Sequence, residues 1–131
     1  MRFLPLPFLA IFALALITSN AQPSFAEEVI SSGQFEGRSR HVTTGGVTIK
    51  KTAKGAIVIL EKDFVLDGAP DPKVGFGNNG KYDIASQLSV LKSKTGRQEY
   101  AIPASIDPSR YNEIYIWCEK FSVPLGVAKL K

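Results

Sequence analysis

Residues 111–130, YNEIYIWCEKFSVPLGVAKL, carry the strongest strand pattern of the 131-residue chain, together with its only Trp and its only Cys. Side chains alternate between the two faces of a β-strand, and β-branched and aromatic residues fit its pleated surface. The run 112–117 therefore predicts a strand with one isoleucine face and one aromatic face. The isoleucine face has Ile114 and Ile116, and the aromatic face has Tyr115 and Trp117. Cys118 ends the strand on the isoleucine face.

A second alternating run, 123–130, follows the polar link 119–122 and predicts an antiparallel hairpin with the first run. Pro124 cannot donate a ladder hydrogen bond, so it belongs at a sheet edge or at a bulge. The alternation shifts after Gly126, which predicts a bulge at that point. Cys118 then lies beside the hairpin loop, where its sulfur is expected to open to a rim.

Short apolar runs separated by Gly, Pro, Asn and Asp turns recur through the rest of the chain. They predict strands around Phe35 and at 47–49, 56–60, 73–76 and 98–102, with turns at 44–46, 67–72 and 95–96. The Gly-rich run 75–80 is expected to be a turn and not a phosphate-binding loop, because no helical pattern follows it. The run 82–91 fits both a helix and a strand. Asp107 followed by Pro predicts one capped helical turn.

Six or more short strands with such turns predict an all-β fold, either an antiparallel β-sandwich or a flattened barrel. The chain starts with a basic residue, an uncharged run at 3–17 and a small-x-small exit, which are typical of a secretory signal peptide. A membrane anchor needs about 20 apolar residues, more than this run offers. We expect a signal peptide at 1–26, cleaved after Ala26 or, as an alternative, after Ala21. The mature chain 27–131 is then one domain, periplasmic or secreted, with no membrane span.

Composition excludes several classes of function. The 16 Lys and Arg against 12 Asp and Glu give a modest positive charge that is spread along the chain. No basic-aromatic stripe or reading motif accompanies it, so nucleic-acid binding is not expected. One Cys permits no internal disulfide. A hydrolytic triad would have to use His41, the only His, and no nucleophile elbow accompanies any Ser.

The same inventory limits the metal chemistry. A c-type haem needs two Cys and a His, a blue-copper site needs two His and a Cys, and a closed zinc site needs four Cys or His ligands. Two possibilities remain: a non-covalent haem held axially by Cys118, His41 or both, or a bare thiol that reacts as the thiolate. Each residue also has a purely structural alternative. Cys118 can be a buried side chain that completes the isoleucine face, and His41 can form a hydrogen bond within a turn.

A family resemblance rests on the segments GQFEGRSRH (33–41), GGVTI (45–49), the turn segment 64–71, LKSKTGRQEYAIP (91–103) and the C-terminal stretch 111–130. Together they resemble the DM-thirteen domain, a family described as electron-transferring, over the whole predicted mature chain. The resemblance implies a β-sandwich outside the cytoplasm and a redox role through the Cys of the IWC ending, here Cys118. Members are often fused to catecholamine-binding-type β-sandwiches and membrane cytochromes. None lies in this sequence, so the redox partner is expected to be a separate protein.

Two hypotheses of different classes follow. In the first, the protein is an exported redox module that acts through Cys118 as a thiol or as a haem or metal ligand. In the second, it is a non-redox extracytoplasmic binding or assembly module whose Cys is structural. The sequence does not decide whether the protein is an enzyme. We expect four aromatic side chains to act mainly in packing, with a path for electrons as a secondary role: Tyr100, Tyr111, Tyr115 and Trp117.

Overall fold

A computed structural model describes residues 2–5, 7, 13–18 and 27–131. Most of the predicted signal peptide, including both predicted cleavage positions, lies outside these residues. The described residues before 27 belong to no helix or strand. Among all residues described, no helix combines the length and the apolar character needed to cross a membrane.

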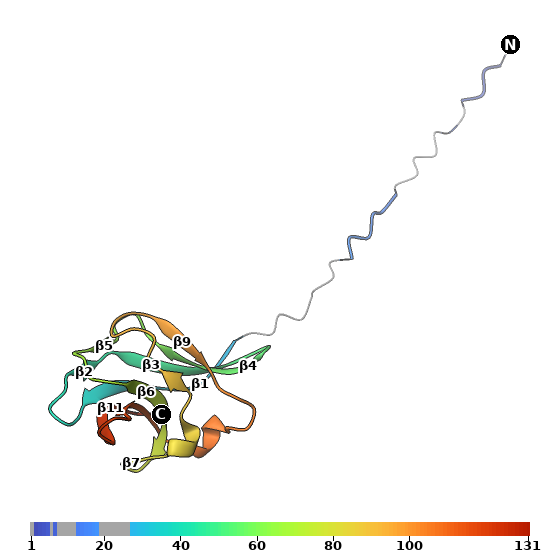
Figure 1. Cartoon of the computed structure of the whole chain (residues 1–131). Helices are drawn as coiled ribbons and strands as arrows, with labels where there is room; N and C mark the ends of the chain where they lie inside the picture. Colours follow the sequence, from blue (N-terminus) through green and yellow to red (C-terminus); the bar gives the residue numbers. More distant parts are fainter. Residues whose placement is uncertain (1, 6, 8–12, 19–26) are drawn as a thin grey trace.

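Strands dominate the chain from residue 28 onward, which confirms the all-β prediction (Figure 1). The strands are β1 (Glu28–Gly37), β2 (Thr43–Thr44), β3 (Gly46–Thr52), β4 (Gly55–Leu60), β5 (Val65–Leu66), β6 (Pro72–Asn78), β7 (Lys81–Tyr82), β8 (Ser89–Val90), β9 (Gln98–Ala101), β10 (Glu113–Cys118) and β11 (Val123–Lys129). Two short 3₁₀ helices, η1 (Ile84–Ser86) and η2 (Pro108–Arg110), interrupt them. Asp107 caps η2 by accepting a hydrogen bond from the Ser109 amide at 3.0 Å, as its sequence predicted.

The main sheet is antiparallel throughout, in the order β7-β6-β10-β11-β1-β3-β4-β9, and it curls into a half-barrel (Figure 1). The long strand β1 makes the corner, because residues 28–34 pair with β3 and residues 35–37 pair with β11. β8 adds to the β6 edge, while β2 and β5 form a separate small pair. Strands far apart in sequence therefore face one another across a shared interior.

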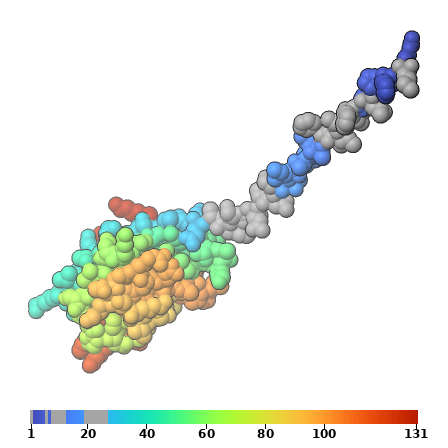
Figure 2. Space-filling view, turned by 90° about the horizontal axis from the view of Figure 1, so that it is seen from above, coloured from blue at the N-terminus to red at the C-terminus, as the bar shows by residue number. Residues whose placement is uncertain are grey.

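A single cluster of buried side chains fills this interior. Its members come from both halves of the curled sheet and include Phe35, Val58, Leu60, Phe64, Val74, Phe76, Ile114 and Ile116. The segment from β8 to η2 runs across one face of the molecule, where it forms the yellow-to-orange surface in Figure 2. It closes the core on that side with Leu91, Tyr100 and Ile102, all buried. The tyrosine hydroxyl is satisfied there, because it donates to Gln98 at 2.6 Å and accepts from the Lys92 amide at 2.8 Å.

The predicted hairpin of β10 and β11 is confirmed, but its bulge lies earlier than predicted. The register passes from Ile116 opposite Gly126 to Trp117 opposite Pro124, so Leu125 is the extra residue. A bulge of one residue reverses the faces of the strand beyond it. For this reason Leu125 and Ala128 both point into the core, although their spacing is odd.

The Gly-rich run 75–80 is only partly a turn. Asn79 and Gly80 turn the chain with positive φ angles of 50° and 85°, as a two-residue hairpin requires. Gly75 and Gly77 instead lie inside β6, where aromatic rings of neighbouring strands cover them. A Cβ on Gly75 would lie 2.6 Å from the Tyr82 hydroxyl oxygen, and one on Gly77 would collide with the Tyr115 ring. The ambiguous run 82–91 resolves into the end of β7, then η1 and β8.

Candidate functional site

Cys118 ends β10 with its side chain in the core, on the isoleucine face that the alternation predicted. Its exposed fraction is 1%. The Sγ atom donates a hydrogen bond to the carbonyl oxygen of Pro70 at 3.2 Å. The prediction that the sulfur opens to a rim is therefore wrong, because a segment distant in sequence closes over the strand end.

The segment that covers the sulfur is the turn 67–72. Its last residue, Pro72, pairs with Cys118 in the sheet, and the Asp71 carbonyl accepts a hydrogen bond from the Glu119 amide at 3.3 Å. Lys73 strengthens this closure by binding the Asp71 carboxylate at 2.8 Å and the Glu119 carboxylate at 3.2 Å. The hydrogen bond to Asp71 is the main cause that raises the pKa of Lys73. These contacts tie the turn to the hairpin loop and keep water away from the thiol.

His41 lies in the loop that follows β1 and contacts the other end of the same turn. Its Nδ1 atom lies 2.9 Å from Asp67 Oδ1, and Asp67 Oδ2 accepts a hydrogen bond from the Val42 amide at 3.0 Å. Both hydrogen bonds lower the pKa of Asp67, and the bond from the Val42 amide has the larger effect. His41 thus acts as a hydrogen-bonding residue in a turn.

The structure does not bring the two predicted site residues into one ligand set. Cys118 contacts Pro70 and His41 contacts Asp67, and no hydrogen bond links the two within the described residues. Nor do any three His, Cys, Asp or Glu side chains in that part of the chain gather closely enough to hold a metal ion. The two Asp residues of the 67–72 turn bind different groups, since Asp67 binds His41 and the Val42 amide while Asp71 pairs with Lys73.

An aromatic cluster, formed by Tyr82, Tyr115 and Trp117, covers the outer face of the sheet behind Cys118. Tyr82 and Trp117 stack with ring centroids 4.4 Å apart and planes 14° apart. Tyr115 lies 5.5 Å from Tyr82 and 6.5 Å from Trp117, centroid to centroid. These spacings are those of favourable aromatic pairs.

Tyr82 is the member of the cluster that the sequence interpretation missed. The signal for it was the Asn79-Gly80 turn, because a two-residue hairpin loop fixes the register of the returning strand. That register places Tyr82 opposite Gly77 in β6. Because the glycines of β6 have no side chains, the Tyr82 ring packs over them and stacks against Trp117.

Comparison with models of known protein families identifies a match over most of the chain. A protein-family model described as "Electron transfer DM13" matches residues 34–130, a range that includes His41, Cys118 and the whole aromatic cluster. Neither a curated protein nor a solved structure matches the chain.

Proposed function

The chain belongs to the DM13 electron-transfer family, and from this membership we propose that it is an electron-transfer module that works outside the cytoplasm with a separate redox partner protein. The extracytoplasmic location is supported by the signal-peptide pattern of residues 1–26. A partner belongs to the proposal because electron transfer needs both a donor and an acceptor, and the matched range 34–130 supplies one such module.

We assign the redox role to Cys118, the only sulfur in the matched range. In the proposed step the thiol gives one electron to a one-electron acceptor on the partner. Its proton leaves along the hydrogen bond to the carbonyl of the exposed Pro70 and passes from there to solvent. The S–H bond breaks and leaves a sulfur radical, which a returning electron and proton convert back to the thiol. The burial of the sulfur supports this one-electron role, because attack by a second thiol or a peroxide would need direct access.

An electron can leave a buried sulfur only through the protein, and Trp117 offers the shortest route in sequence. Its indole is half-buried and stacks on Tyr82 on the outer face, whereas Cys118 faces the core. The Trp117–Tyr82 stack, with a ring separation of 4.4 Å, is the observation that carries the proposal. It links the interior to the surface on which a partner can dock.

A haem at Cys118 does not fit this structure. An axial ligand must present its sulfur to an open face of the iron, whereas the Cys118 sulfur is packed in the core and bound to Pro70. His41 keeps one ring nitrogen free of hydrogen bonds within the described residues, since Asp67 binds the other, but Cys118, the other predicted haem ligand, is packed in the core. We therefore route no step through haem.

The experiment is a count of electrons with hexachloroiridate(IV), a soluble one-electron oxidant, under anaerobic conditions. Native protein should consume about one equivalent of the oxidant per chain in a fast phase, and this phase should be missing in Cys118→Ala. Trp117→Leu should slow this phase without changing its amplitude, while the exposed Phe121→Leu serves as the matched control and should behave like wild type. If Cys118→Ala consumes as much oxidant as wild type in the same phase, Cys118 is not the redox group.

A second function is favoured by one observation, the 1% exposure of Cys118 within the core cluster. In this alternative the protein is a non-redox binding or assembly module and its Cys only packs. It predicts that native protein consumes no oxidant in a fast phase and that Cys118→Ala changes stability alone.

A further inference from the structure

A pocket lies on the outer face of the sheet, at the opposite end of β10 from Cys118. Its volume is about 570 Å³. The residues that matter for its chemistry are Arg38, Gly80, Asn112, Glu113, Lys129 and Leu130. They come from the end of β1, the β6–β7 turn, β10 and β11, so the pocket depends on the curl of the whole sheet.

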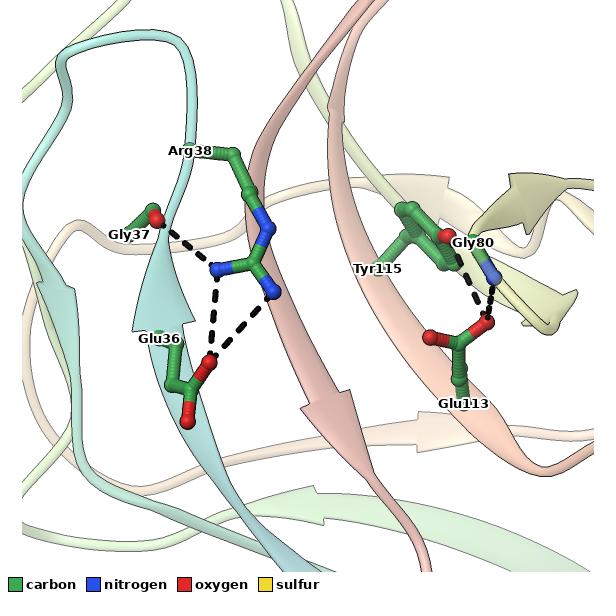
Figure 3. Close-up of polar contacts among 6 residues, drawn as sticks. All are labelled: Glu36, Gly37, Arg38, Gly80, Glu113 and Tyr115. Carbon is green, nitrogen blue, oxygen red and sulfur yellow. Dashed lines mark hydrogen bonds and ion pairs between the residues drawn. The ribbon is translucent and has the colours of Figure 1, made fainter.

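Glu113 supplies a buried carboxylate to this pocket, with an exposed fraction of only 5%. Its Oε1 atom accepts a hydrogen bond from the Gly80 amide at 2.7 Å and from the Tyr115 hydroxyl at 3.4 Å. The other oxygen points away from both donors, toward the side on which Arg38 lies (Figure 3). That oxygen accepts no hydrogen bond from the described residues.

The free oxygen of Glu113 must open into the pocket. Within the described residues, no side-chain oxygen or nitrogen is fully buried without a hydrogen-bond partner. An acceptor that lacks a partner is therefore still accessible, and Glu113 is one of the residues that line this pocket. A largely desolvated carboxylate oxygen without a donor gains free energy from any ligand that brings one.

Three cationic side chains line the pocket, those of Arg38, Lys129 and Lys131, and the first two lie on strands or strand ends that flank Glu113. Arg38 is oriented by the Gly37 carbonyl at 3.0 Å and by Glu36 at 3.4 Å, a long contact that leaves donor capacity on the guanidinium (Figure 3). Lys129 is exposed, and no ion pair engages it in the described part of the chain. A guanidinium fork and an ammonium group that line the same pocket suit the oxygens of a carboxylate.

We propose that this pocket binds a small hydroxycarboxylate. The carboxylate of the ligand binds Arg38 and Lys129, and its hydroxyl donates to the free oxygen of Glu113. The buried acid makes the site selective, because a ligand without the hydroxyl leaves that oxygen unpaired. The inference rests on the pocket alone and goes beyond the electron-transfer role, so the two can fail separately.

The test compares malate with succinate, two dicarboxylates that differ by one hydroxyl. Isothermal titration of the full chain should give a dissociation constant in the millimolar range for malate. Malate should bind about tenfold more tightly than succinate, as expected for one hydrogen bond to a charged group in a partly wet site. Nuclear magnetic resonance should place the largest amide shifts at Gly80 and Lys129, with none at Gly55, the first residue of β4, which does not line the pocket.

Variants identify the contacts. Glu113→Gln keeps an oxygen for the Gly80 and Tyr115 donors and turns an NH₂ toward the pocket, so it should abolish the preference for malate over succinate. Lys129→Met and Arg38→Met should weaken both ligands, whereas Lys120→Met, on the hairpin loop at the other end of β10, should weaken neither. The proposal is overturned if wild type binds the two ligands equally, if it binds neither in the millimolar range, or if Lys120→Met and Lys129→Met have equal effects.

Discussion

Cys118 and Trp117 are neighbours in the chain, yet their side chains lie on opposite faces of β10, one in the core and one in the outer aromatic cluster. The period-two pattern of the strand predicted this division correctly. It could not predict how deeply the sulfur is buried, because its covering carbonyl, that of Pro70, is 48 residues away in sequence. Local alternation determines the face to which a side chain points, and tertiary packing determines whether solvent can reach it.

The burial of Cys118 predicts a thiol that is protected in the native state. Cys118→Ala should fold and lose about 1–2 kcal/mol, because it leaves a small cavity in a packed core. Cys118→Ser should lose about 1 kcal/mol, since its hydroxyl can donate to the Pro70 carbonyl in place of the thiol. Urea unfolding at constant m-value measures both. A thiol reagent should label wild type only as fast as the chain opens, and fast labelling of native protein would contradict the buried position.

The tyrosines carry a second prediction at this scale. Folding raises the pKa of all four tyrosines of the chain. Burial raises the pKa of Tyr115 to about 12, and it also raises the pKa values of Tyr82 and Tyr100. A hydrogen bond to Asp83 raises the pKa of Tyr111. A raised pKa means that the folded state holds the proton more tightly than the unfolded state. This contribution to stability is complete below pH 10 and is lost as the pH rises above it.

Native protein should therefore show less tyrosinate absorbance near pH 10 than the unfolded chain, with Tyr82 and Tyr115 still protonated there. The same chain in denaturant should titrate all four groups near pH 10, which provides the control. Tyr115→Phe should make stability less sensitive to alkali. Full ionisation of all four tyrosines near pH 10, while the circular dichroism spectrum stays native, would contradict the packing of Tyr82 and Tyr115 in the aromatic cluster.

At the scale of the element, β6 shows why some of the fold was predictable and some was not. The Asn79-Gly80 turn, the β10–β11 hairpin and the Asp107 cap follow from local rules, and the structure confirms them. Gly75 and Gly77 were assigned to a turn, whereas they lie in a strand because rings from β7 and β10 need their space. The use of a glycine for close packing depends on neighbours that a single sequence does not place.

Gly77→Ala tests this packing. The new Cβ would collide with the Lys81 carbonyl oxygen and with the Tyr115 ring, and backbone cannot yield as a flexible side chain can. We expect a loss of at least about 2 kcal/mol of unfolding free energy in urea. Gly46→Ala is the matched control, because its nearest atoms belong to the side chains of Gln34 and Glu61 at 3.3 Å. The control should lose less than about 1 kcal/mol, and equal losses would contradict the crowding of β6.

At the scale of the whole molecule, the curl of the sheet places two different chemistries at the two ends of β10. The sulfur lies under the 67–72 turn at one end, and the Glu113 pocket opens at the other. The sequence predicted the first end through its only Cys. It could not predict the pocket, because Arg38 and Glu113 share it only after β1 turns the corner between β3 and β11.

The position at which β1 begins bears on the predicted cleavage of the signal peptide. β1 begins at Glu28, where it pairs with Lys51 of β3, so cleavage after Ala26 would leave every strand of the main sheet intact. We therefore predict that protein recovered outside the cytoplasm starts at Glu27, as read by amino-terminal sequencing and intact mass. A start at Gln22 would indicate the alternative cleavage after Ala21.

The matched control for this prediction is Leu14→Arg, which breaks the uncharged run 3–17 without touching the folded part of the mature chain. It should keep the protein uncleaved in the cytoplasm, because a signal peptide needs an apolar centre. An uncleaved wild-type chain in the membrane fraction would show that the run anchors the protein. The electron-transfer partner would then have to be sought beside that membrane and not among freely diffusing proteins.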